Sequence, residues 1–178
     1  QQLPFNFTLK QSDDAEKKLQ LIIHNDEERI IIDEVTRKGD SLLITFNFYD
    51  TEIRAKIEKD KLKGIYNKRY SENHILGFEA EFGNEKRFIA NNEGSTHPVA
   101  GRYSVIFTEE DGKEYPAVAK LEQAGKKVTG TFLTETGDYR YLEGLVDGDS
   151  LKLSAFDGTH LFLFTAFING DTLQNGEF

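Results

Sequence analysis

The residues best placed to do chemistry are an Asp-x-x-His pair and a nearby group of basic and aromatic side chains. His160 follows Asp157 by three residues and opens an apolar strand, where its imidazole can offer a ligand a hydrogen bond. Arg140 lies between Tyr139 and Tyr141, and strand alternation places its guanidinium on the opposite face from both rings. There it would clamp the carboxylate or another anion of a ligand. The alternatives are a structural ion pair between Arg140 and Asp157 at a hairpin corner, and a histidine that caps a turn. These five residues form the predicted ligand-binding site.

The sequence Gly-Asp-Ser-Leu occurs twice, at residues 39–42 and 148–151, and its serines are Ser41 and Ser150. Together with Asp157 and His160 they resemble the signature of the GDSL hydrolases, whose triad consists of serine, histidine and aspartate. That chemistry needs a serine on a strand-to-helix turn and a set of oxyanion donors, whereas each copy here lies between two predicted strands. The family's oxyanion glycine and asparagine blocks are also missing. We therefore interpret Ser41 and Ser150 as turn residues that satisfy local backbone groups.

The remaining composition excludes other kinds of site within these residues. Cysteine is absent, so disulfides, thiolate metal sites and cysteine nucleophiles are excluded. The four histidines show none of the short spacings that are typical of metal ligands. We expect no metal, no cofactor and no catalytic residue in this segment, and therefore no enzyme activity of its own.

The net charge limits which classes of partner are expected. The 178 residues contain 22 Lys and Arg against 31 Asp and Glu, which gives a net charge of −9. Nucleic-acid binders carry a basic stripe and anionic bilayers attract clustered basic residues, so neither is an expected partner. No stretch approaches the ~18 consecutive apolar residues of a membrane-spanning helix.

Regular turn signals indicate the elements that must position these side chains. In the second half, glycines in Asp-Gly, Asn-Gly and similar pairs recur every 10 to 13 residues, at Gly112, Gly125, Gly137, Gly148, Gly158 and Gly170. Such pairs favour tight hairpins because both central residues of a type I′ turn need positive φ. Short β-branched and aromatic runs between them predict an all-β antiparallel meander.

The predicted strands cover most of the chain. In the first half they are residues 19–24, 28–35, 41–49, 52–58, 62–67 and 75–82. In the second half they are residues 102–108, 115–122, 127–134, 138–145, 150–156 and 159–168. Residues 12–18 are predicted to form a loop.

The domain organisation follows from a polar seam and a repeat. Residues 90–98 contain Gly94 and Pro98 and no apolar period, so they join two halves, 1–92 and 98–178. The two Gly-Asp-Ser-Leu turns indicate two copies of a strand–hairpin–strand unit. Because open sheet edges invite aggregation, we favour one β-barrel-like domain over residues 1–178. The architecture is expected to be an up-and-down, calycin-like barrel or two packed β halves.

Much of the sequence resembles a known family. Residues 125–134, 136–144 and 153–164, with Leu3-Pro4-Phe5-Asn6-Phe7 at the start, resemble the region that precedes the thioredoxin domain in exported TlpA-like thiol–disulfide oxidoreductases of Bacteroidota-type bacteria. In that family the redox chemistry belongs to a later Cys-x-x-Cys thioredoxin fold. The resemblance implies an extracytoplasmic setting, in the periplasm or cell envelope, with a lipid anchor on a removed upstream segment. It transfers no catalytic residue to this chain.

A second resemblance is to the calycins. Gly101-Arg102-Tyr103 is similar to the Gly-x-Trp that opens a lipocalin strand, and Val128-Thr129-Gly130-Thr131-Phe132 is similar to an avidin strand. An up-and-down barrel of this type implies a small apolar ligand inside it.

These observations lead to one expected function and one alternative. We expect a non-catalytic accessory or interaction domain of an exported thiol–disulfide oxidoreductase, whose partners are its own C-terminal thioredoxin-like domain and a client protein. The alternative is a calycin-like barrel that binds a small molecule or a lipid.

Overall fold

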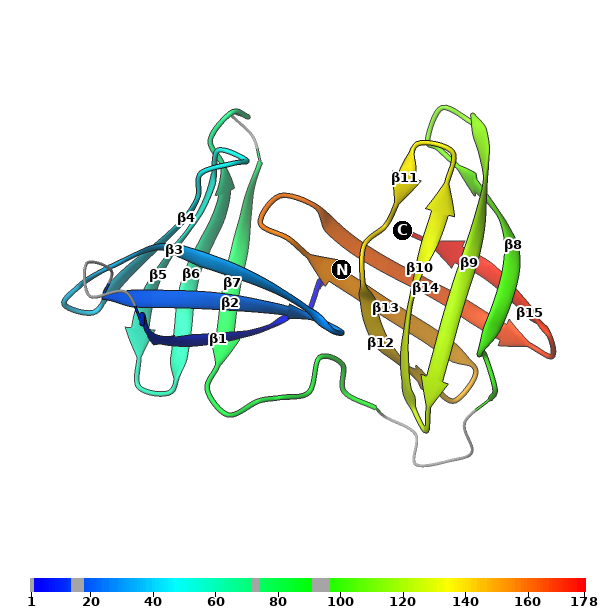
Figure 1. Ribbon diagram of the computed structural model, residues 1–178, viewed down its shortest axis with the longest axis horizontal. Helices are drawn as coiled ribbons and strands as arrows, with labels where there is room; N and C mark the ends of the chain where they lie inside the picture. Colours follow the sequence, from blue (N-terminus) through cyan, green and yellow to red (C-terminus); the bar gives the residue numbers. More distant parts are fainter. Residues whose placement is uncertain (1, 14–17, 72–73, 91–96) are drawn as a thin grey trace.

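The chain folds into two curled antiparallel sheets, which lie side by side in Figure 1. The computed structural model describes residues 2–13, 18–71, 74–90 and 97–178. Within these residues every regular element is a strand, and each sheet runs up and down in nearly sequential order. The predicted all-β, up-and-down antiparallel fold is therefore confirmed, in the form of two packed β halves.

The N-terminal sheet contains seven strands of the described chain in sequential order. They are β1 (Asn6–Gln11), β2 (Leu19–Asn25), β3 (Glu28–Lys38), β4 (Ser41–Phe46), β5 (Thr51–Glu58), β6 (Lys61–Lys68) and β7 (Ile75–Glu81). Buried and exposed side chains alternate along β4, as expected for a strand with one face on a core. The rings of Phe7 on β1 and Phe78 on β7 lie 6.3 Å apart, so the two end strands approach one another and the sheet curls into a half-barrel.

The C-terminal sheet repeats this plan with eight strands of the described chain. They are β8 (Gly101–Thr108), β9 (Glu114–Ala124), β10 (Lys127–Thr134), β11 (Gly137–Asp138), β12 (Leu142–Asp147), β13 (Ser150–Phe156), β14 (Leu161–Asn169) and β15 (Thr172–Glu177). Its two ends also meet through aromatic rings, since the rings of Phe107 on β8 and of Phe178, directly after β15, lie 4.7 Å apart. Aromatic side chains thus bridge the open side of both half-barrels.

The change of sheet falls between β7 and β8, in the connection that contains the predicted seam at residues 90–98. Of that seam, residues 91–96 lie outside the described residues. The predicted loop at residues 12–18 falls largely outside them as well, because residues 14–17 are not described.

The two Gly-Asp-Ser-Leu segments form the same kind of turn in the two sheets. Each forms a two-residue turn and then begins a strand, β4 in one sheet and β13 in the other. In both, the carbonyl of the aspartate accepts a hydrogen bond from an isoleucine amide on the next strand, Ile57 to Asp40 at 2.8 Å and Ile168 to Asp149 at 2.7 Å. The two turns thus share their sequence and this hydrogen bond, although β4 and β13 hold different positions in their sheets.

Each sheet encloses its own core, and the β13–β14 hairpin sends a side chain from one sheet into the core of the other. Phe156 belongs to β13 of the C-terminal sheet, yet it is 1% exposed and packs in the N-terminal core. Its ring lies 4.5 Å from that of Phe5, 5.7 Å from that of Phe46 and 5.6 Å from that of Tyr66. Figure 1 shows the end of the β13–β14 hairpin, in orange, reaching toward the N-terminal sheet. We call residues 156–160 the plug.

Candidate functional site

The five predicted site residues do not form one group. Arg140, Asp157 and His160 meet at the plug, between the two sheets. Tyr139 packs instead against the core of the C-terminal sheet, and Tyr141 is 52% exposed. The site therefore consists of three of the predicted residues together with groups from the N-terminal sheet.

The strand predicted for residues 138–145 is wrong at its centre, and so is the alternation derived from it. β11 ends at Asp138 and β12 begins at Leu142. Arg140 between them has φ of 56°, in the left-handed region, and its amide donates to the Asp138 side chain at 3.0 Å. A residue in that conformation turns the chain, so Arg140 and the two tyrosines do not alternate across a strand.

Asp157 is the centre of the plug. Its side chain is 2% exposed, and one carboxylate oxygen accepts from the amides of Thr159 at 3.0 Å and His160 at 2.8 Å. The other oxygen lies 2.8 Å from Nδ1 of His160. Burial opposes ionisation of the carboxyl, but these hydrogen bonds outweigh burial and lower the pKa of Asp157 below its ordinary value. An aspartate that binds backbone amides two and three residues later fixes the turn after β13.

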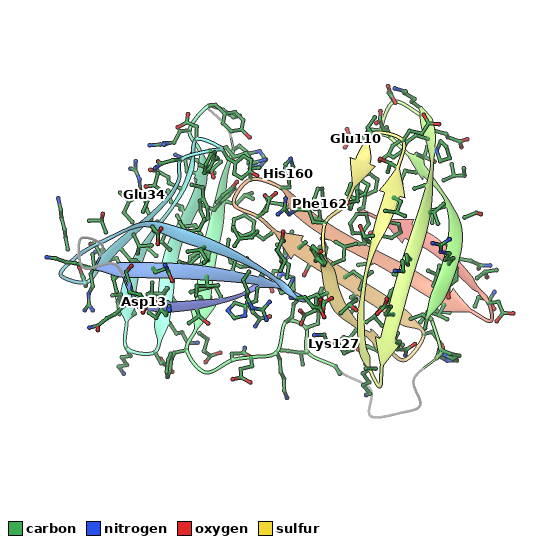
Figure 2. All side chains as sticks on the ribbon, in the orientation of Figure 1. Asp13, Glu34, Glu110, Lys127, His160 and Phe162 are labelled. Atoms are coloured by element: carbon green, nitrogen blue, oxygen red, sulfur yellow. The ribbon has the colours of Figure 1, made fainter. Side chains whose placement is uncertain are left out.

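His160 completes this turn rather than standing apart from it. Its ring stacks on that of Phe162 at 5.4 Å and meets the edge of Tyr49 at 6.1 Å. Figure 2 shows His160 and Phe162 on the hairpin that lies between the two sheets. Because Asp157 holds Nδ1 and the side chain is 56% exposed, Nε2 is the ring nitrogen left for other contacts. The geometry is that of a histidine capping a turn.

Arg140 links the plug to the N-terminal sheet. Its guanidinium donates to the carboxylate of Glu28 on β3 and lies 3.7 Å from the Asp157 carboxylate. Burial disfavours the charge, but Glu28 and then Asp157 outweigh it and raise the pKa of Arg140. Because two carboxylates of the protein already hold the guanidinium, its geometry is that of a structural ion pair rather than of an open anion clamp.

Neutral hydrogen bonds hold the tip of the plug. The carbonyl of Gly158 accepts from the hydroxyls of Thr51 and, at 3.1 Å, Tyr66. Burial raises the pKa of Tyr66 to about 12. Asn25, which is fully buried, donates to the carbonyl of Phe156 at 2.9 Å and accepts from its amide at 3.3 Å. The side-chain amide of Asn25 thus pairs with the backbone of the opposite sheet.

Arg87 joins the two sheets from the connecting segment after β7. Its guanidinium donates to the carbonyl of Ser154 at 2.9 Å and to the carbonyl of His24. Burial lowers the pKa of Arg87, while the charges of Glu143 and Asp26 act in the opposite direction. The residue is 8% exposed, so its guanidinium binds carbonyl groups inside the protein.

A further ion cluster lies at the junction of the sheets. The amide of Asp26 donates to the Glu143 carboxylate at 2.8 Å, and Lys127 lies 3.7 Å from Asp26 and 3.5 Å from Glu143.

Sequence reasoning missed Glu28, Asn25 and Arg87 altogether. No local pattern marks them, because their contacts between the two sheets are with groups that are distant in the chain.

The serines do not assemble a hydrolase triad. Ser150 begins β13 and Asp157 follows its end, and a strand rises about 3.3 Å per residue, so roughly 20 Å separate them. Ser41 lies on β4 in the other sheet, where its hydroxyl donates to Asp40 at 3.3 Å. Both serines are turn residues at the start of a strand. Across the described parts of the chain, no three metal-binding side chains gather into a group that could hold an ion.

Aromatic side chains fill the interior of the C-terminal half-barrel, where a calycin would hold its ligand. The rings of Phe132 and Phe164 lie 4.6 Å apart, and that of Tyr139 lies 5.3 Å from Phe164. The hydroxyls of Tyr139 and Tyr115 share a hydrogen bond of 2.7 Å, and burial raises the pKa of Tyr139. The space between the strands is thus occupied by the protein itself.

Comparison with family models, with curated proteins and with solved structures finds no match for this chain. In the described residues, no helix has the length and apolar character needed to cross a membrane.

Proposed function

We propose that this chain is a non-catalytic accessory domain of an exported thiol–disulfide oxidoreductase, with the redox chemistry carried by a thioredoxin-like domain outside these residues. The observation that supports the proposal most directly is that the charged groups at the plug bind one another. Glu28, Arg140 and Asp157 form one chain of carboxylate, guanidinium and carboxylate across the two sheets. Groups that would otherwise bind a substrate are engaged in holding the sheets together.

This use of charge suits a rigid module. A charge-assisted hydrogen bond joins Arg140 to Glu28, an ion pair joins it to Asp157, and a fully buried amide at Asn25 pairs with the backbone opposite it. Removing one partner of such a contact leaves the other buried and unsatisfied, which is costly, so the two half-barrels keep one relative orientation. A module of fixed shape is what positioning a redox domain, or presenting a surface to a client protein, requires.

The oxidoreductase part of the proposal is supported by the sequence resemblance of residues 125–164 and of the first residues of the chain. With it come an extracytoplasmic location and a lipid anchor on an upstream segment. The partners that follow are the protein's own thioredoxin-like domain and a client protein.

The coding sequence after Phe178 tests this part directly. A thioredoxin-like segment with Cys-x-x-Cys is the expected result. A reading frame that continues into any other fold, or that ends without one, refutes the oxidoreductase assignment and leaves only the rigid two-sheet module.

A hydrolase assay tests the non-catalytic part. The purified 178-residue chain is expected to release no nitrophenol from a nitrophenyl ester above the buffer rate, and Ser41→Ala and Ser150→Ala are expected to behave identically. Hydrolysis that disappears in either variant would show that the turn assignment of the serines is wrong.

A further inference from the structure

The outer face of the N-terminal sheet carries a hollow that the plug and the cores do not use. It has a volume of about 590 Å³ and lies over β3, β4, β5 and β6, on the solvent side of the sheet. Its lining includes four cationic side chains, two hydroxyl side chains and one leucine at the surface: Lys38, Arg54, Lys56, Lys63, Thr36, Ser41 and Leu43. This volume lies within the range of small-molecule sites.

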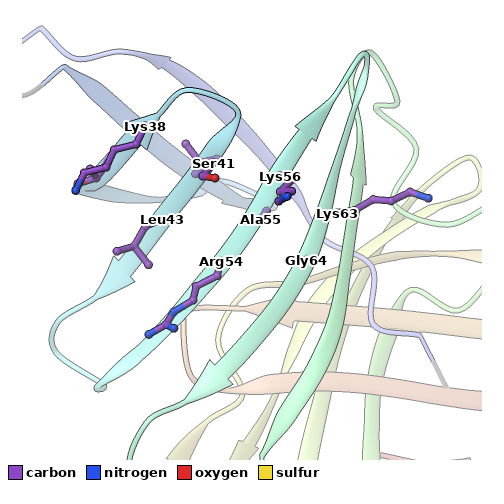
Figure 3. Close-up of a pocket in the computed structure, with 10 residues that line it drawn as sticks. Lys38, Ser41, Leu43, Arg54, Ala55, Lys56, Lys63 and Gly64 are labelled. Carbon is purple, nitrogen blue, oxygen red and sulfur yellow. The ribbon is translucent and has the colours of Figure 1, made fainter.

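The strand register sets the cationic side chains in a row. Lys38 pairs with Ser41, Ser41 pairs with Lys56, and Lys56 pairs with Lys63. Figure 3 shows this row crossing the strands, with Leu43 and Arg54 beside it. Lys56 and Lys63 stand directly opposite one another, an arrangement of like charges that destabilises a sheet. In a chain with a net charge of −9, such a row is a departure that an anionic ligand would explain.

The protein's own carboxylates neutralise only part of this charge. Lys63 lies 3.9 Å from Glu79, and Arg54 lies 2.7 Å from Glu52. Among the described residues, no carboxylate lies within ion-pair distance of Lys38 or Lys56. The middle of the row therefore keeps its positive charge.

The surface between the charges is apolar. Leu43 is 36% exposed, and lysine stems present methylene groups to the same hollow. Gly64 pairs with Ala55, whose side chain is buried in the core, so neither residue places a side chain in the hollow.

We propose that this hollow binds an organic anion with an apolar body, in the size class of a medium-chain carboxylate. Lys56 and Lys63 hold the anionic group, and Arg54 and Lys38 flank it. The hydrocarbon body lies along Leu43 and the lysine stems. An inorganic ion would leave the apolar surface unused, and an anionic bilayer would be repelled by the net charge of the whole molecule. This binding property is independent of the accessory role proposed above.

Titration of the isotopically labelled 178-residue chain with octanoate, followed by amide chemical shifts, tests the proposal. Octanoate is expected to shift amides of β3 to β6 in a saturable way, whereas acetate, which lacks the apolar body, and octanol, which lacks the charge, bind at least about fivefold more weakly. Equal binding of octanol or of acetate overturns the proposal, as does the absence of saturable shifts with octanoate.

Three variants locate the binding. Lys56→Gln is expected to weaken octanoate binding about fivefold, and Leu43→Ser is expected to weaken it by a similar factor through the lost apolar contact. Lys113→Gln, in the loop between β8 and β9, removes the same charge from a distant exposed position and is expected to change nothing. If Lys56→Gln and Lys113→Gln weaken binding equally, only net charge matters and the site is refuted.

Discussion

Replacing Phe156 by alanine should destabilise the N-terminal sheet, although Phe156 lies on a strand of the C-terminal one. The ring is 1% exposed and is enclosed by Phe5, Phe46 and Tyr66 at centroid distances of 4.5 to 5.7 Å. Truncating a buried phenylalanine to alanine costs about 3–5 kcal/mol, because apolar burial is lost and a cavity remains. Since the ring is almost fully buried, we expect about 4 kcal/mol.

The assay is urea unfolding followed by NMR signals assigned to each sheet. In Phe156→Ala, the methyl groups of Ile44 and Ile53 should shift and lose their dispersion at lower urea than in the unaltered protein. Phe164→Ala is the matched control, because Phe164 is 5% exposed but packs in the C-terminal core. It should leave the folded-state shifts of Ile44 and Ile53 unchanged. The reasoning is refuted if Phe156→Ala leaves the Ile44 and Ile53 signals and their unfolding midpoint as they were.

Three further perturbations probe the plug. Gly158→Ala should cost about 2–3 kcal/mol in urea unfolding, because φ is 107° and a Cβ would lie 2.5 Å from the Phe46 ring; Gly77→Ala, with open space around it, is the control. The lowered pKa of Asp157 means that the unfolded chain takes up a proton first as the pH falls. Stability should therefore decline below about pH 4, and Asp157→Asn should flatten that decline. Tyr66, with a pKa raised to about 12, ionises first in the unfolded chain. Unfolding at increasing pH should show stability lost between pH 10 and 12, and Tyr66→Phe should reduce that loss by about 3 kcal/mol while leaving the part due to Tyr139.

The local part of the fold was predictable from the sequence. Tight turns with glycine depend on neighbouring residues alone, so strands such as β10 and β13 were placed at the residues where the structure has them. β1 was not predicted, because Asn6–Gln11 has no turn signal before it and gains its order by pairing with β2. Strand prediction also failed at Arg140, where a non-glycine residue adopts a left-handed conformation that sequence alternation does not reveal.

The site was predictable only in part. Asp157 was named as a partner for Arg140, and the structure places the two side chains 3.7 Å apart. Glu28 was not, because it lies 112 residues away on a strand of the other sheet. Phe156 looks like an ordinary core residue of β13, and nothing in its local pattern tells which core it enters. Neighbouring residues determine the turns, whereas the docking of the two sheets depends on contacts that only the assembled fold brings together.

The central claim is that the plug unites the two half-barrels into one cooperative structure. Amide signals of Ile44 on β4 and Leu153 on β13, followed together through urea unfolding of the intact chain, test it most directly. The two signals are predicted to disappear with the same midpoint and the same slope. Separate midpoints for the two sheets would contradict the claim and show that each half-barrel is stable without the other.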